Sequence, residues 1–191
     1  FGLYPQDSVP RLDDLGFKSI NVGRARITGV DITLAGQGRV WKIPVTLLLG
    51  YTYTDPRDLV KDPVYLNGKS TAGNILKYRN YYSIKGDVEF EPGLFLVGLS
   101  YSYSSRVINI DRTFEDPLIP GTNLYILPGL SEYRANHNKG YHLLDLRIGF
   151  TPTEGSRFTL LLKNVLNAEY MTRPGLIEAP RSLALQYSTR F

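Results

Sequence analysis

The 191 residues could supply one globular core or several membrane strands, so length alone leaves both arrangements open. No apolar stretch approaches the roughly 18 residues of a membrane-spanning helix, which excludes a helical membrane protein. The net charge of +4 comes from scattered Lys and Arg side chains that form no basic run, so the sequence does not favour a nucleic-acid partner.

Seven segments alternate apolar and polar residues with a period of two, the pattern of a strand whose two faces meet different surroundings. In the first of them, Val30, Ile32 and Leu34 share one face. We expect strands of roughly 9 to 11 residues, the length that crosses a bilayer core when the strand is tilted. The seven segments are residues 25–35, 45–54, 82–90, 95–104, 144–150, 158–164 and 183–191.

Charged side chains fall on one face of these segments. In residues 144–150, Asp145 and Arg147 face away from the row that contains Leu144 and Leu146. The last segment is the clearest, because all its odd-numbered residues from Leu183 are apolar or aromatic except a single Thr, and its even-numbered residues are small or polar. One face therefore suits hydrocarbon and the other suits water, which predicts an all-β, antiparallel transmembrane β-barrel.

The connections between the segments alternate in length. Outer-membrane barrels have short periplasmic turns and long extracellular loops, so this alternation supports a barrel and predicts that the last strand ends in the periplasm. The short turns are residues 37–42, 91–93 and 151–157, and the longer loops are residues 54–78, 105–140 and 171–180.

Aromatic residues gather at the predicted strand ends, as expected of girdles at the two membrane interfaces. The outer group consists of Tyr51, Tyr53, Tyr81, Tyr82, Tyr101 and Tyr103. The inner group consists of Trp41, Phe90, Phe95, Phe150, Phe158 and Phe191.

Three motifs carry a resemblance to a known family. They are Asn164-Val165-Leu166-Asn167 followed by Tyr170, then Ala179-Pro180-Arg181, and upstream the stretch at 21–31, which has Asp31 where the family has Glu. In this order they resemble the C-terminal part of TonB-dependent outer-membrane receptors. The likeness extends over nearly the whole chain, although the family's plug domain and energy-coupling segment have no counterpart in it.

The resemblance implies that residues 1–191 are the C-terminal segment of a 22-stranded barrel with a plugged lumen, of which they supply about seven strands. It also implies the outer membrane of a Gram-negative bacterium and active uptake of an extracellular nutrient, most often an iron-siderophore or similar metal chelate. The implied partners are the TonB energy-coupling complex, acting through the plug, and the insertion machinery, which reads Tyr187 and Phe191. A surface lipoprotein partner stays open.

Side chains in the predicted loops are candidates for ligand recognition, because arginine and tyrosine suit an anionic chelate or a sugar. Nothing in the sequence predicts a catalytic residue, a cofactor or a metal site; His142 and Asp145 lie three apart on a strand and point to opposite faces. The ligand candidates are Arg57, Tyr65, Arg79, Arg106, Arg112, Tyr125 and Arg134, with Tyr78 and Tyr133 beside them in the same loops.

Other interpretations stay open at this point. Single-chain bacterial barrels have an even number of strands, so an eighth strand within residues 1–23 would make a small complete barrel that acts as a passive channel or as a structural or adhesion protein. A soluble lipid-binding barrel and a barrel enzyme are further rivals. The ligand class also stays open among metal chelate, vitamin, haem, glycan and peptide.

Overall fold

The computed structural model describes residues 24–61, 68 and 74–190. The question of a further strand within residues 1–23 lies outside this described part. Seven strands form one antiparallel sheet in the order β1-β2-β3-β4-β5-β6-β9. They are β1 (Ala25–Val40), β2 (Ile43–Asp58), β3 (Tyr82–Phe90), β4 (Phe95–Ser104), β5 (Tyr141–Thr153), β6 (Ser156–Lys163) and β9 (Ser182–Thr189).

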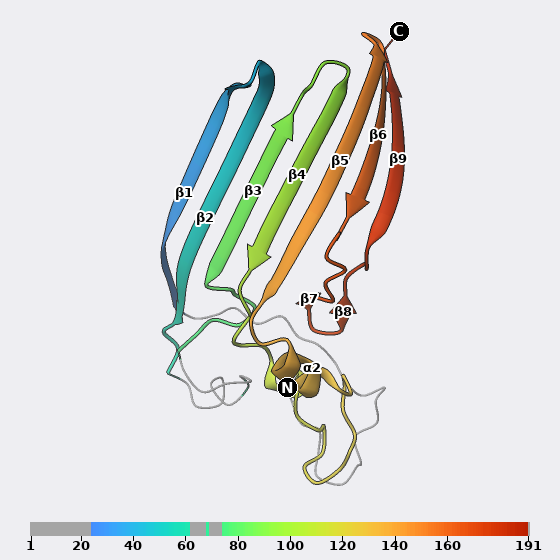
Figure 1. Cartoon of the computed structure of the whole chain (residues 1–191). Helices are drawn as coiled ribbons and strands as arrows, with labels where there is room; N and C mark the ends of the chain where they lie inside the picture. Colours follow the sequence, from blue (N-terminus) through green and yellow to red (C-terminus); the bar gives the residue numbers. More distant parts are fainter. Residues whose placement is uncertain (1–23, 62–67, 69–73, 191) are drawn as a thin grey trace.

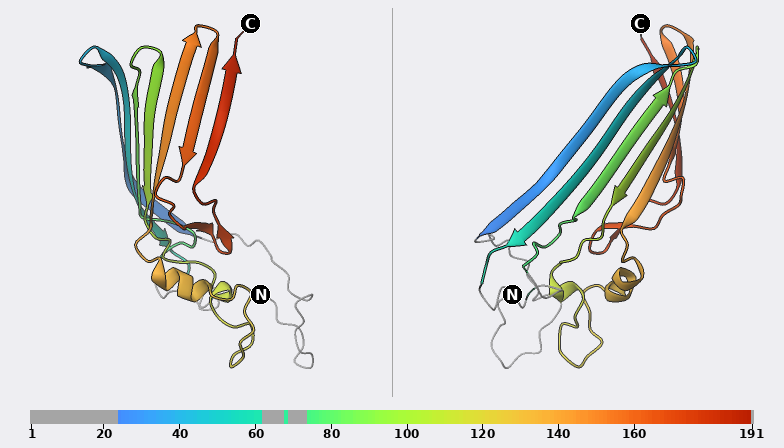
Figure 2. Two further views of the ribbon diagram at one scale, coloured as in Figure 1. Left: turned by 45° about the vertical axis from the view of Figure 1, so that its right-hand side comes forward. Right: turned by 60° about the vertical axis from the view of Figure 1, so that its left-hand side comes forward.

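The sheet is curved, and its two ends differ in what they carry (Figures 1 and 2). The tight turns and the end of β9 lie at one end of the strands. At the other end lie the long loops, the helix α2 (Leu130–Asn136), the short helix η2 (Arg112–Phe114) and a small hairpin of β7 (Met171–Arg173) and β8 (Leu176–Ile177). The predicted alternation of short turns and long loops is therefore seen in space.

The seven predicted strands are confirmed, but several are longer or shorter than expected. β1 and β2 have 16 residues each, because their pairing runs without interruption from Ala25↔Asp58 to Val40↔Ile43. The predicted turn at residues 37–42 shrinks to Trp41 and Lys42, whose φ angles are 49° and 73°. Two-residue hairpins need such positive φ values, and because Trp41 and Lys42 are not Gly or Asn, the sequence predicted the turn without its exact position.

Pairing across the sheet gathers apolar side chains on one face, because directly opposed residues of antiparallel strands point the same way. One such row of side chains crosses six strands. It ends with Leu160 of β6 opposite Leu185 of β9. Leu185 is 75% exposed, so nothing in the described chain covers this face. The whole row is Val45, Phe90, Val97, Ile148, Leu160 and Leu185.

The opposite face is polar and lines the hollow side of the curved sheet, where a concavity of about 490 Å³ is bounded by Asp31, Lys85, Asp87 and Asp145 among others. This is the face that the sequence pattern assigned to water. Hydrocarbon on the convex side and water on the concave side is the arrangement of a transmembrane barrel wall.

One ion network ties three strands together on the polar face. The Arg147 guanidinium donates to both carboxylate oxygens of Asp87, at 3.0 and 3.1 Å, and also to Ser100 Oγ and Glu89 Oε2 at 2.8 and 3.3 Å. The side chain crosses β4 at Gly98, where an added Cβ would lie 2.8 Å from the Arg147 Nε. A Cβ at position 98 would push the guanidinium aside, so Gly98 leaves room for Arg147 to link β3 and β5 across β4 in this geometry.

Aromatic pairs mark both ends of the convex face. Phe95 stacks on Phe150 with ring centroids 5.1 Å apart near the turns, and Tyr53 contacts Tyr82 at 5.3 Å near the loops. Tyr187 joins the first group through Phe158, at 4.7 Å. Phe191 lies outside the described residues, so the insertion signal predicted for Tyr187 and Phe191 stays a prediction.

Asn164 closes the exit from β6. It is 5% exposed and has a φ angle of 49°; its side-chain amide donates to the carbonyls of Ala168 and Ala179, and its Oδ1 accepts from the Ala168 N–H at 2.9 Å. Its own N–H donates to Asp145 Oδ1 at 2.8 Å. Asn167 Oδ1 in turn accepts from the Arg181 N–H, so two of the sequence motifs meet in one turn.

Substitution of Asn164 tests this turn. Asn164→Gly keeps the positive φ but removes the side-chain hydrogen bonds, and should lower the free energy of unfolding by about 2–3 kcal/mol at about 1 kcal/mol per bond. Asn164→Ala should cost about 1 kcal/mol more, because its Cβ disfavours this backbone conformation. The measurement is urea unfolding of the barrel in lipid, with the exposed Asn138→Ala as a control. Equal stability of the Gly and control variants would show that the turn does not depend on the amide.

Candidate ligand-binding site

The two longest loops pack on each other beyond the end of the sheet. Ile110 is 1% exposed, Leu130 4% and Leu76 8%, which makes them a small apolar core outside the sheet. Asn109 is fully buried and bridges the loops. Its side-chain amide donates to the Ile75 carbonyl at 2.9 Å, and its main-chain carbonyl accepts from the Tyr78 N–H at 2.8 Å. The loops thus have a packed structure of their own.

Ion pairs reinforce this loop core. Arg134 of α2 donates from Nε to Glu115 Oε1 at 2.6 Å and from a terminal nitrogen to the Ile108 carbonyl at 3.0 Å. Both side chains of the pair are largely buried, at 13% and 17% exposed. Asp111 accepts from Lys77 and from the Tyr78 hydroxyl. Burial, followed by the bond to Asp111, raises the pKa of Tyr78 above its usual value, so its hydroxyl stays protonated and donates to Asp111.

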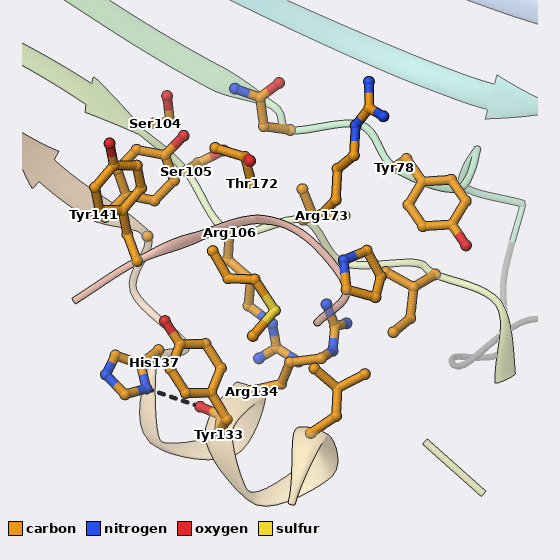
Figure 3. Close-up of a pocket in the computed structure, with 18 of the residues that line it drawn as sticks. Tyr78, Ser104, Ser105, Arg106, Tyr133, Arg134, His137, Tyr141, Thr172 and Arg173 are labelled. Atoms are coloured by element: carbon orange, nitrogen blue, oxygen red, sulfur yellow. Dashed lines mark hydrogen bonds between the residues drawn. The ribbon is translucent and has the colours of Figure 1, made fainter. Parts of the chain in front are cut away.

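A hollow of about 360 Å³ opens between the loop after β4, the helix α2 and the β7–β8 hairpin. Figure 3 shows Arg106, Tyr133, Arg134 and Arg173 around this space, contributed by three different segments. A volume of this size lies in the range of small-molecule sites, which runs from about 300 to 1,000 Å³. The full aromatic lining is Tyr78, Tyr133, Tyr141 and Tyr170.

The walls of the hollow contain stacked rings. The Tyr133 and His137 rings lie 4.0 Å apart at an interplanar angle of 18°, and His137 Nδ1 is 3.0 Å from the Tyr133 carbonyl oxygen. Tyr141 contacts Tyr170 at 4.7 Å between ring centroids. Three arginines and one acid, Glu169, line the space, which gives it an excess of positive charge. A ligand with negative charge and flat apolar surface suits such a site.

Of the candidates from sequence, the structure brings Arg106 and Arg134 together at this hollow. Arg57 instead shares the convex face of the sheet with Tyr53 and binds Asp55 at 2.7 Å. Arg112 binds Asp116 on the exposed surface at 2.5 Å. Arg79 is exposed, Tyr125 is half-buried, and neither lines the hollow; Tyr65 lies outside the described residues.

Sequence reasoning missed several lining residues. Arg173 and Thr172 lie in the 171–180 loop, where no periodic pattern marks them. Tyr141 stands on the polar face at the start of β5, opposite Ser104, and the alternation of β5 extended upstream from Leu143 would have placed it there. Tyr170, which the sequence analysis placed only within a family motif, lies against Tyr141.

The two histidines take part in ring contacts. His142 Nδ1 lies 2.7 Å from the Tyr101 hydroxyl on the convex face, while Asp145 accepts from the Asn164 N–H on the other face. The two side chains therefore do not meet, as the strand geometry predicted. Within the described residues, no group of three or more His, Cys, Asp or Glu side chains is placed to hold a metal ion.

None of the described helices is long and apolar enough to cross a membrane.

Comparison with protein families gives one match. The family model described as "TonB dependent receptor-like, beta-barrel" matches residues 3–168, which is well over half of the chain. No curated protein matches the chain.

The loop core makes a prediction about Arg134. Replacing it with Met breaks a largely buried ion pair and leaves Glu115 without its partner, which should cost about 3 kcal/mol of local stability. Arg112→Met is the matched control, because its pair with Asp116 is exposed, at 55% and 48%, and such pairs contribute less than about 1 kcal/mol. Hydrogen exchange of the amides in residues 106–137 measures both. Equal exchange in the two variants would contradict the role given to Arg134.

Proposed function

This chain belongs to the TonB-dependent receptor β-barrel family, and we propose that it forms the C-terminal part of the barrel of a receptor that takes up an anionic metal chelate. Members of the family are outer-membrane receptors and transporters that interact with TonB, so transport rather than chemical conversion of the ligand is the activity that family membership supports. The observation that carries the ligand class is the arginine-lined hollow at the loop end of a polar-walled sheet.

The open sheet supports the proposal that these strands are part of a larger barrel. Among the described residues, β1 and β9 each pair with one neighbour. The backbone groups along the other edge of each strand need partners in a hydrocarbon environment, because water is absent there. In a 22-stranded barrel, the preceding strands would pair with β1 and the first strand of the barrel would pair with β9.

The polar concave wall supports a plugged lumen. Charged side chains of both signs lie on this face, among them Asp31, Asp145 and Lys163, and Asp87 and Glu89 share the one guanidinium of Arg147. A plug that fills the lumen would lie against these side chains, and TonB would act on the plug. The insertion machinery would recognise the end of β9, and a lipoprotein on the loops stays an open partner.

The position of the hollow supports uptake from outside. Barrels of this class have their long loops on the extracellular side, and the hollow lies among those loops, at the end of the polar wall. A ligand that binds there would enter the lumen along polar side chains, whose hydrogen bonds can replace those of its hydration shell. An iron-siderophore is the ligand class we propose, since iron chelates commonly carry carboxylate or catecholate oxygens and a net negative charge.

Uptake of radiolabelled iron tests the proposal. Cells without their own ferric-chelate receptors, producing the full-length protein, should accumulate iron supplied as ferric citrate, and a protonophore should abolish accumulation but not surface binding. Iron supplied with a cationic hydroxamate chelator is the control and should enter poorly, because the arginines repel it.

Uptake that continues unchanged in the presence of the protonophore would support a passive channel instead. If no ferric chelate enters but haem, a vitamin, a glycan or a peptide does, the receptor assignment holds and the ligand class is wrong.

A further inference from the structure

Two polar side-chain atoms of residues that line the hollow have no hydrogen-bond partner among the described residues. Among the described residues, the Arg106 Nε and the Tyr133 hydroxyl are buried from water, and neither has a protein partner. Both residues line the hollow, and they come from different segments, the loop after β4 and the helix α2 (Figure 3). Buried donors without acceptors are rare in proteins because each loses its hydrogen bond to water and gains nothing in return.

The neighbouring donors are already used by the fold. Arg134 is bound by Glu115 and the Ile108 carbonyl. The Tyr78 hydroxyl is bound to Asp111. All four residues line the same space, and all four are of types that suit an anionic ligand. The Nε of Arg106 and the hydroxyl of Tyr133 lack an acceptor within the described residues, whereas Arg134 and Tyr78 already donate to one.

The hydroxyl of Tyr133 is kept in its donor form. Burial, and then the negative charge of Glu169, raise the pKa of Tyr133, so the phenol remains protonated. The guanidinium of Arg106 has only hydrogen-bond donors. Both groups thus offer hydrogens, and the group that would satisfy them has acceptor atoms and negative charge.

We propose that Arg106 and Tyr133 together bind an oxyanion of the ligand, a carboxylate or a catecholate oxygen, and that Arg134 holds the loop and does not contact the ligand. This assignment rests on the proposed uptake of an anionic chelate and names the side chains that recognise it. Because both atoms are buried from water in this structure, contact with the oxyanion requires the side chains around them to shift.

This assignment has a signature that a purely structural role lacks. Tyr133→Phe removes an unsatisfied hydroxyl, so the unliganded protein should be as stable as the wild type or more stable, while its affinity for an oxyanion falls. A hydroxyl that served the fold would give the opposite result, a loss of stability. The same variant thus separates ligand recognition from structure.

The test uses the full-length protein in detergent, with benzoate as the oxyanion probe and benzamide as its neutral counterpart. Benzoate should bind and benzamide should not, as measured by saturation-transfer NMR. Arg106→Gln and Tyr133→Phe should each weaken benzoate binding at least about tenfold, the loss expected for a hydrogen bond to a charged group. Arg112→Gln, whose side chain is exposed and away from the hollow, is the matched control and should bind benzoate like the wild type.

Two results would overturn the assignment: benzoate binding that is unchanged in both variants, or a wild-type protein that does not distinguish benzoate from benzamide. Melting temperatures of the unliganded variants, recorded in parallel, show whether each barrel is folded. Iron uptake by the wild type is scored separately. A receptor that transports ferric citrate but binds benzoate equally well in all variants keeps the proposed function and loses this site.

Discussion

The pairing of backbone groups is the constraint on which the rest of this structure depends. Inside a bilayer no water is present to bond an exposed N–H or C=O, so strands that cross it pair with one another. Pairing then aligns side chains in rows across neighbouring strands, as in the row that ends in Leu160 and Leu185. A shift of one residue would turn every apolar side chain toward the lumen, so register, membrane contact and the polar wall are fixed together.

The loops obey a different rule, because water surrounds them and their backbone needs no sheet. Their order comes from a small core around Ile110 and from ion pairs such as Arg134 with Glu115. This second core sets the walls of the hollow, while the sheet sets its position. The unpartnered donors of Arg106 and Tyr133 lie where the two meet, and departures from complete hydrogen bonding are expected at functional sites.

Features with a local period were readable in the sequence, and features that depend on distant partners were not. The alternation in residues 183–191 predicted both the strand and its faces. The bond of Arg147 to Asp87 joins residues 60 apart and depends on the register of two strand pairs. The same holds for the hollow, where Arg106 and Arg173 meet only through loop packing, which has no repeat to read.

The central claim is that one face of each strand meets lipid and the other meets the lumen. The most direct measurement compares Leu185→Arg with Gln186→Arg in the full-length protein, since these neighbours on β9 point to opposite faces. Leu185→Arg should lower the free energy of unfolding from lipid by about 2–4 kcal/mol, the cost of a charge near mid-membrane. Gln186→Arg should leave it within about 1 kcal/mol of the wild type, since lumen-facing substitutions avoid that cost. Equal costs for the two substitutions, or a larger cost for Gln186→Arg, would contradict the account.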